Sequence, residues 1–209
     1  TAQVAALDSD HVAAFSTAQI SRLTTAAIQA LTTDNVVGLD SADIAQLTTA
    51  QVRALDVADL NRLSSDQFGA ISATGVGAMT TAQVAGLDSD HVAAFSTTQI
   101  SQLSTAAVQA LTTDNVVGIE TPADIAKLNS AQVRALDVAD LNRLNSDQVA
   151  AISSAGVQGL TTAQLNALSS DVVAALTTAQ LNTLNSAQIG GFTTAGLGSI
   201  DAADMGAFN

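Results

Sequence analysis

The sequence predicts an all-α fold, an α-solenoid of very short helices with one helix in each eight-residue repeat. Three observations predict it. Every eighth residue from Asp8 onward begins a new unit, here called an octad, and the count shifts only once, at Glu120. The first position is Ser, Thr, Asp or Asn in all 25 full octads. The fifth and eighth positions are always Val, Ile, Leu, Phe or Met. An unbroken period of this kind is typical of a repeat array.

The first residue of each octad is suited to begin a helix. In TTAQVRAL, residues 48–55, the hydroxyl of Thr48 can accept a hydrogen bond from the third helical residue. Gln51 stands at that third residue, which is the spacing of a capping box. Leu47 and Val52 have the spacing of a hydrophobic staple across the cap. We therefore expect a helix in every octad, including the one that begins TP at Thr121, because proline is tolerated at the first helical position.

Each helix lasts about a turn and a half, which is too short to be stable alone. The fifth and eighth positions lie on one helical face, so we expect both to point into a shared core. Positions three, six and seven are mostly small, so adjacent coils can approach closely. A β-solenoid is the alternative for short repeats, but the octads lack the strict polar-apolar alternation of a strand. The helical interpretation is favoured.

A longer period of 80 residues is superimposed on the octads. DSDHVAAFST occurs at residues 8–17 and again at 88–97. The sequence thus forms one continuous domain, 1–209, with blocks at 1–80, 81–161 and a diverged 162–209. Aspartate at position three recurs on average every 3.3 octads, which predicts about 3.3 octads, or 27 residues, per superhelical turn. At about 9 Å per coil, this predicts a rod about 70 Å long.

Composition excludes several classes of protein. The chain has no cysteine, which excludes disulfides and thiolate metal sites. Its net charge of −13 disfavours nucleic acid and anionic membranes as partners. No apolar run approaches the roughly 20 residues of a membrane span, so no membrane insertion is expected. The chain begins in mid-octad without a signal peptide, so we expect an excerpt of a longer protein.

The candidate metal ligands are few. His11 and His91 are the only histidines, and they occupy equivalent places in two copies ten octads apart, so they cannot pair. Asp8, Asp10 and His11 form a possible metal cluster. The alternative is that Asp8 caps a helix and Asp10 lies in its first turn, where the helix dipole favours negative charge. The capping interpretation is favoured, and we expect no metal and no cofactor.

Catalytic motifs are not present. The sequence contains no Gly-x-Ser-x-Gly and no phosphate-binding glycine loop, and it presents the same side chains over and over. One charged cluster is repeated, and we interpret it as a set of solvated surface ion pairs of little energetic value. We expect no catalytic residues and no enzyme activity. The cluster comprises Arg53, Asp56, Asp59 and Arg62, with copies Arg134, Asp137, Asp140 and Arg143.

The strings LTTAQV, LTTAQL and LSTAAV resemble the octapeptide regions of very large secreted or surface-anchored Gram-negative proteins, described as adhesin-like or RTX-like. The resemblance extends over the whole chain and is one of repeat style. It implies an extracellular or cell-surface spacer or filament, and it assigns no functional residues.

Three functions follow from these observations as alternatives. The first is structural, a stalk, spacer or filament segment, which duplicated blocks favour because duplication adds length. The second is a repetitive binding or adhesion surface for a protein, a glycan or ice. The third is an acidic imitation of DNA, which the charge of −13 fits poorly because duplex DNA of equal length carries roughly 40 charges. The structural function is favoured.

The ends of the array lead to one further expectation. Natural solenoids cover their terminal coils with atypical polar repeats, and none is visible here. TAQVAAL at the start is an ordinary octad without its first residue, and DAADMGAF near the end keeps its apolar positions. Head-to-tail contacts need not close, so we expect copies of the chain to associate end to end into filaments.

Overall fold

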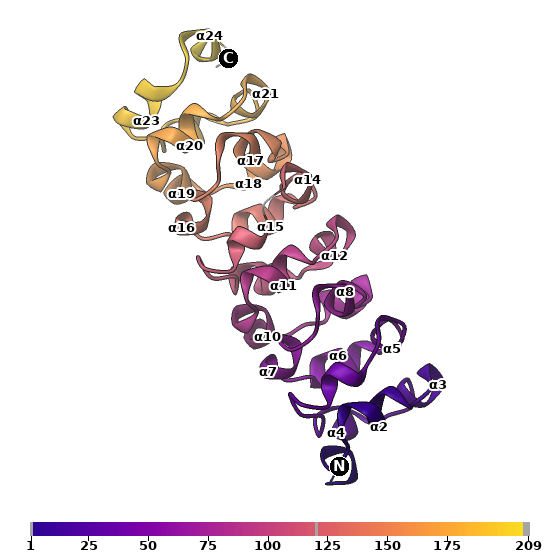
Figure 1. The fold of residues 1–209 in the computed structure, drawn as a ribbon. Coiled ribbons are helices and arrows are strands. Elements are labelled where there is room, and N and C mark those ends of the chain that lie inside the picture. The colour runs from indigo at the N-terminus through magenta and orange to yellow at the C-terminus, as the bar shows by residue number, and fades with distance from the viewer. Residues whose placement is uncertain (1, 120, 207–209) are drawn as a thin grey trace. The chain divides into compact units, whose positions relative to one another are not determined.

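The structure is a computed structural model that describes residues 2–119 and 121–206. All regular secondary structure within these residues is helical (Figure 1). It consists of 24 α-helices of four to six residues and two 3-10 helices of three residues. The all-α fold of very short helices is therefore confirmed.

The chain forms two compact units, Thr1–Ala110 and Leu111–Asn209, which are described separately. The helices of the first unit each occupy one octad. They are α1 (Ala2–Ala5), α2 (Ser9–Ala13), α3 (Thr17–Ile20), α4 (Thr25–Ile28), η1 (Val36–Gly38), α5 (Ser41–Ala45), α6 (Thr49–Ala54), α7 (Val57–Leu60), α8 (Ser65–Gly69), α9 (Ala73–Gly77), α10 (Thr81–Gly86), α11 (Ser89–Ala93), α12 (Thr97–Gln102) and α13 (Thr105–Gln109).

The second unit repeats this arrangement. Its helices are η2 (Val116–Gly118), α14 (Pro122–Ile125), α15 (Ser130–Ala135), α16 (Val138–Leu141), α17 (Ser146–Ala151), α18 (Ser154–Gly159), α19 (Thr162–Ala167), α20 (Ser170–Ala174), α21 (Thr178–Leu181), α22 (Ser186–Ile189), α23 (Thr194–Ser199) and α24 (Ala202–Met205).

The predicted capping pattern is present. The α6 helix begins after Thr48, whose backbone N–H donates to Gln51 Oε1 at 2.8 Å. The Gln51 N–H donates in return to Thr48 Oγ1 at 3.3 Å, which completes the capping box. Pro122 occupies the first turn of α14 after the Thr121 cap. The octad therefore encodes both the start of a helix and its end, because the next cap is extended backbone.

Two octads depart from this pattern. In the two TTDNVVG segments, residues 32–38 and 112–118, the regular helix is a 3-10 helix that begins at the fifth position, η1 and η2. Adjacent valines and a glycine have low helix propensity, which accounts for the missing α-helix. Gly38 is required by packing, since a Cβ there would overlap the Ser9 carbonyl of α2.

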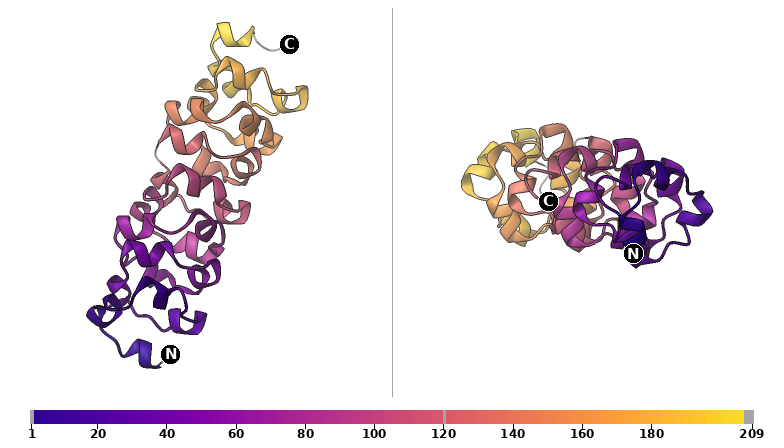
Figure 2. Two further views of the ribbon diagram at one scale, coloured as in Figure 1. Left: turned by 90° about the vertical axis from the view of Figure 1, so that its right-hand side faces the viewer. Right: turned by 60° about the horizontal axis from the view of Figure 1, so that its bottom comes forward.

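Within each unit the coils stack at an interval of three octads. In the first unit α2 contacts η1, α6 contacts α9 and α9 contacts α12. In the second unit α15 contacts α18 and α20 contacts α23. The views in Figure 2 show the helices of each unit winding in successive coils. Side-chain hydrogen bonds, described below, join octads four apart. A coil therefore closes between three and four octads, in agreement with the predicted 3.3.

In each unit the core is formed by the fifth and eighth side chains of the octads. Most of them are fully buried, including Ile44, Val52 and Leu60, and Phe68 is the largest. Small residues let the coils approach, as predicted. A Cβ at Gly159 would lie 2.8 Å from the Ser130 carbonyl oxygen of the preceding coil. The positions of the octad that are buried are thus those that the sequence predicts.

Candidate functional site

The side chain at the fourth position of the octad makes hydrogen bonds both within its own octad and to another coil. Gln51 is 2% exposed and uses both ends of its amide. Its Oε1 accepts the cap hydrogen bond from Thr48. Its Nε2 donates to the carbonyl oxygens of Ile20 at 3.1 Å and Leu23 at 2.8 Å, four octads earlier. One side chain therefore begins its own helix and holds the preceding coil.

This contact recurs through both units. Gln83 donates to the carbonyls of Val52 and Leu55 at 2.8 and 2.7 Å. Gln180 donates to the carbonyls of Val149 and Ile152 at 2.8 and 2.6 Å. We call the set the position-4 ladder. Its described members are Asn35, Gln51, Gln67, Gln83, His91 and Gln99 in the first unit, and Gln148, Gln164, Gln180 and Gln188 in the second.

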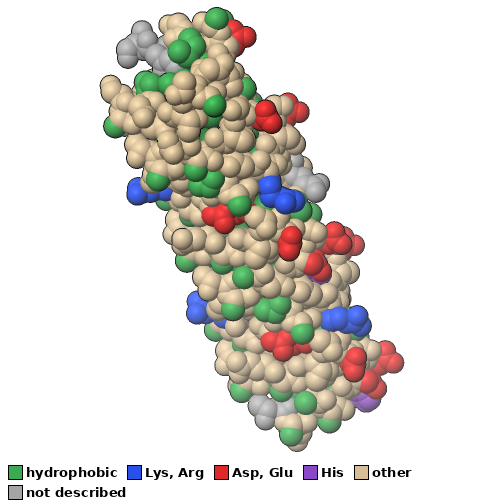
Figure 3. Space-filling view, turned by 90° about the vertical axis from the view of Figure 1, so that its left-hand side faces the viewer, with side chains coloured by type: hydrophobic (Ala, Val, Ile, Leu, Met, Phe, Trp, Pro, Cys, Tyr) green, Lys and Arg blue, Asp and Glu red, His purple; other side chains and the backbone are tan. Residues whose placement is uncertain are grey.

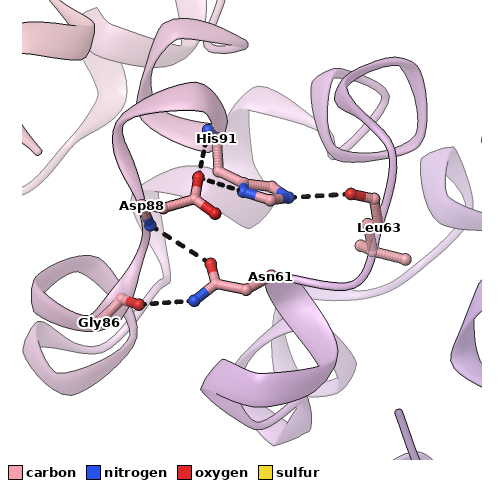
Figure 4. Close-up of polar contacts among 5 residues, drawn as sticks. All are labelled: Asn61, Leu63, Gly86, Asp88 and His91. Carbon is pink, nitrogen blue, oxygen red and sulfur yellow. Dashed lines mark hydrogen bonds and ion pairs between the residues drawn. The ribbon is translucent and has the colours of Figure 1, made fainter. Parts of the chain in front are cut away.

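His91 is the ladder member with titratable chemistry (Figure 4). Its Nδ1 lies 2.5 Å from Asp88 Oδ1, and its Nε2 lies 2.9 Å from the Leu63 carbonyl oxygen. Both neighbours are acceptors, so both contacts are hydrogen bonds only when the imidazole carries two protons. The ring also packs edge-on against Phe68 at 4.9 Å between centroids. These contacts hold α11 to the preceding coil.

Asn61 and Asp88 extend the His91 cluster. Asn61 Nδ2 donates to the Gly86 carbonyl at 2.8 Å, and Asn61 Oδ1 accepts from the Asp88 N–H at 3.4 Å. Burial acts to raise the pKa of Asp88, but hydrogen bonds from the His91 backbone and ring outweigh it. The pKa of Asp88 therefore lies below its ordinary value of 3.8, and its carboxylate stays ionised beside the histidine.

His11 has the same sequence around it but a different environment. Its Nδ1 lies 2.5 Å from Asp8 Oδ1, as in the later copy. Its side chain is 67% exposed, compared with 9% for His91. Within the described residues, its ring makes no hydrogen bond to another coil. The structure thus brings Asp8 and His11 together as a helix cap, and it does not bring His11 to His91.

Two members of the repeated charged cluster are placed differently from the sequence interpretation. Asp59 and Asp140 were expected in surface ion pairs, and this is wrong, because they are 1% and 2% exposed. Both occupy position four, which points toward the preceding coil. Arg53 and Arg62 donate instead to the carbonyls of Ala78 and Thr33. Across the described residues, the ion pairs are those of His11 with Asp8 and His91 with Asp88.

Burial has a strong effect on these two carboxyls. It raises the pKa of Asp59 to about 6, and the nearby charge of Asp56 adds to the increase. It likewise raises the pKa of Asp140 to about 6, with a further increase from Asp137 and an opposing effect of Arg143. One carboxyl oxygen of each residue is buried without a hydrogen-bond partner. These are the least satisfied polar groups of the core.

The position-three aspartates form an exposed column in the first unit, as the recurrence of 3.3 octads predicted. Asp10, Asp34, Asp66 and Asp90 are all exposed. The segments that carry them are adjacent, since α2 contacts η1 and α8 contacts α11. Gln67 completes the series by donating to the Val37 carbonyl at 3.2 Å. On the face drawn in Figure 3, charged side chains are sparse among uncharged polar and apolar atoms.

A shallow hollow of about 330 Å³ lies in the second unit beside η2 and α16, lined in part by Asp140, Arg143 and Gln148. It combines a single carboxyl with a single guanidinium.

In the described part of the chain, no three His, Cys, Asp or Glu side chains gather closely enough to hold a metal ion. None of the helices there has the length and apolar character that crossing a membrane requires.

Sequence reasoning identified only half of the role of position four. It predicted the capping contact and missed the hydrogen bonds to the coil four octads earlier. A signal was available, because glutamate serves a capping box as well as glutamine but never occurs at this position. An ionised glutamate can only accept, whereas the amide of glutamine both accepts from the cap and donates to a carbonyl.

Comparison with known proteins agrees with this repetitive construction. A family model described as the ALTTAQ repeat matches the chain six times, at residues 4–40, 36–73, 68–97, 87–121, 116–154 and 149–178. A search of curated proteins found no match.

Proposed function

The chain belongs to the ALTTAQ repeat family, and from this premise we infer that it is a structural spacer segment that adds length to a larger bacterial protein. The position-4 ladder carries this proposal. Its buried amides join one coil to the next. When the buried polar side chains of a solenoid bond adjacent coils to each other, each added octad increases the length of the solenoid.

We propose that the segment works outside the cell or at the cell surface. The style of its LTTAQ repeats resembles that of adhesin-like and RTX-like proteins, and the absence of cysteine is compatible with that location. The finer assignment to an adhesin rests on this resemblance. Immunogold labelling of intact bacterial cells that express the parent protein tests the proposed location, and labelling confined to lysed cells would refute that location.

Small-angle scattering tests the spacer function directly. The chain is compared with a variant in which residues 81–161 are inserted once more. The proposal expects the maximum dimension to increase by about 27 Å, because 81 residues make about three coils at roughly 9 Å each. An unchanged maximum dimension would show that the added repeats fold back, and the spacer function would then be wrong.

We also propose that copies of the chain associate end to end. Each coil presents carbonyl oxygens on one side and position-4 amides on the other, so the two sides are complementary and directional. Gln19 is exposed, and its Nε2 has no hydrogen-bond partner among the described residues. It is therefore available to the last coil of another copy. Contacts of this kind are heterologous and generate open filaments.

Sedimentation velocity at increasing concentration tests the association. The matched variant is Gln19→Glu, which keeps an oxygen to accept from Ser16 and removes the donor. The proposal expects the wild-type sedimentation coefficient to rise with concentration and the variant to show a weaker rise. A wild-type chain that remains monomeric throughout would contradict the proposal without affecting the spacer function.

A further inference from the structure

The polar side chains of the position-4 ladder meet the preceding coil as hydrogen-bond donors, because their partners are backbone carbonyls. Glutamine and asparagine supply amide donors at any pH. Asn35 shows that the shorter side chain suffices, since its Nδ2 donates to the carbonyls of Val4 and Leu7 at 3.1 Å each. An aspartate of the same length can donate there only while it is protonated.

Asp59 occupies this place in octad 7. It is 1% exposed, and its Oδ2 is buried without a partner. Gln51 and Gln67, one octad before and one octad after it, donate to carbonyls four octads earlier, and from this register we infer that Asp59 faces the carbonyls of residues 24–31. Asp56 caps the same helix, and Arg62 directs its guanidinium to the Thr33 carbonyl. The α4 and α10 helices carry no titratable side chain.

Asp140 is the equivalent residue of octad 17. It is 2% exposed, and its Oδ1 is buried without a partner. The charged groups that face it are Asp137, the cap of its own helix, and Arg143 beside the shallow hollow. The following coil, α19, carries no titratable side chain. The two copies therefore share one arrangement, a buried carboxyl with a free oxygen.

We propose that octad 7 is a pH-responsive joint, in which a neutral Asp59 completes the position-4 ladder and its ionisation breaks the ladder, and that Asp140 of octad 17 responds to pH in the same way. Three other acids at this position differ in a way that limits the proposal to these joints, and one of them, Asp204, accepts a hydrogen bond from the Thr178 hydroxyl. Asp43 accepts a hydrogen bond from the Asp40 N–H at 3.3 Å, and Asp124 accepts one from the Thr121 hydroxyl at 2.6 Å. All three have a partner while ionised.

The direction of the pH effect follows from the raised pKa of the two carboxyls. A carboxyl with a pKa near 3.8 in the unfolded chain and about 6 in the folded chain favours the neutral form on folding. The stability that it contributes is fully present below pH 3.8, and it is lost as the pH rises to about 6. The joints should therefore be tight in mildly acidic solution and loose at neutral pH.

The test compares thermal unfolding at pH 4.5 and pH 7.5 for three forms of the full chain. They are the wild type, Asp59→Asn/Asp140→Asn, and the control Asp66→Asn/Asp147→Asn, which changes exposed carboxyls of the adjacent octads. His91 is common to all three, so its protonation cancels. We expect the asparagine variant at the joints to unfold at least about 3 °C above the wild type at pH 7.5, with a much smaller difference at pH 4.5. The control should follow the wild type.

Equal unfolding profiles of the wild type and the joint variant would overturn the proposal. A second measurement is independent of whether the variants fold. Carbon NMR of the wild-type carboxyls should show two side chains that titrate with midpoints near 6. Their assignment follows from their loss in the joint variant. If every aspartate titrates near 4, the joints do not exist.

Discussion

The decapeptide DSDHVAAFST occurs twice, and its two copies differ in burial although their sequences are identical. His91 is almost enclosed and bonds to the Leu63 carbonyl of the coil before it, whereas His11 is largely exposed. In both copies the backbone N–H of the histidine donates to the capping aspartate. The local sequence thus fixes the helix and its cap, and the neighbouring coil fixes the environment of the side chain.

The largest difference is expected at the end of the decapeptide. Phe95 is 5% exposed and its ring lies 5.2 Å from that of Phe68, so Phe95→Ala should lower the free energy of unfolding by about 3–5 kcal/mol. Phe15 is only partly buried, so Phe15→Ala should cost clearly less. Urea denaturation of both variants measures the two values. Equal losses of free energy would mean that Phe15 in the first octad is packed as tightly as Phe95 in the eleventh.

The ladder itself should give the next largest effect. Gln51→Glu keeps an acceptor for the Thr48 cap and removes both donors to the preceding coil. Because it leaves buried carbonyls unpaired, we expect a loss of about 1–3 kcal/mol. The same change at Gln19, whose Nε2 meets no other coil in the described chain, should cost less than about 0.5 kcal/mol. If chemical denaturation gives equal losses for the two variants, the hydrogen bonds of the position-4 ladder to the preceding coil do not stabilise the fold.

The histidines provide a smaller contrast. His91→Ala removes a buried hydrogen bond to Leu63 and the contact with Phe68, which should cost about 1–2 kcal/mol. His11→Ala should change the free energy of unfolding by no more than about 0.5 kcal/mol. Thermal unfolding at constant pH distinguishes them, and a larger effect at His11 would reverse the comparison.

The smallest effect is expected from metal removal. Asp8 and Asp88 are engaged by their histidines as helix caps, so neither copy needs a cation. Adding EDTA should leave the melting temperature within about 1 °C of its value without chelator, because only loss of a ligand bound to the folded state would lower it. A clear drop would revive the cluster of Asp8, Asp10 and His11 as a metal site.

Much of the fold is predictable from the sequence because the octad signals are local. Thr48 and Gln51 sit three residues apart, which is enough to define the cap, and Val52 and Leu55 define the buried face. The superhelical repeat is also accessible, because the position-three aspartates mark one face. Local pattern failed at octads 4 and 14. In octad 4 the Thr32 N–H still donates to Asn35 Oδ1, but Val36–Gly38 form a 3-10 helix instead of an α-helix.

The buried aspartates could not be predicted in the same way. Arg62 and Arg53 lie three and six residues from Asp59 in the sequence, and this spacing predicts surface ion pairs. Its burial follows from the coil four octads away, and the register of that contact is not contained in one octad. The same holds for the second hydrogen bond of Gln51. Contacts at a separation of 28 residues depend on the superhelical geometry, which local periodicity only approximates.

The most direct test of the central claim, that position four joins each coil to the one four octads earlier, is the exchange of the histidine ring protons. We predict one histidine Nε2–H proton that exchanges slowly with solvent in proton–nitrogen NMR spectra at pH 5. That signal should belong to His91, and it should disappear in His91→Gln. The ring N–H of His11 should exchange rapidly, because it meets solvent instead of the Leu63 carbonyl. Rapid exchange at both rings would contradict the account.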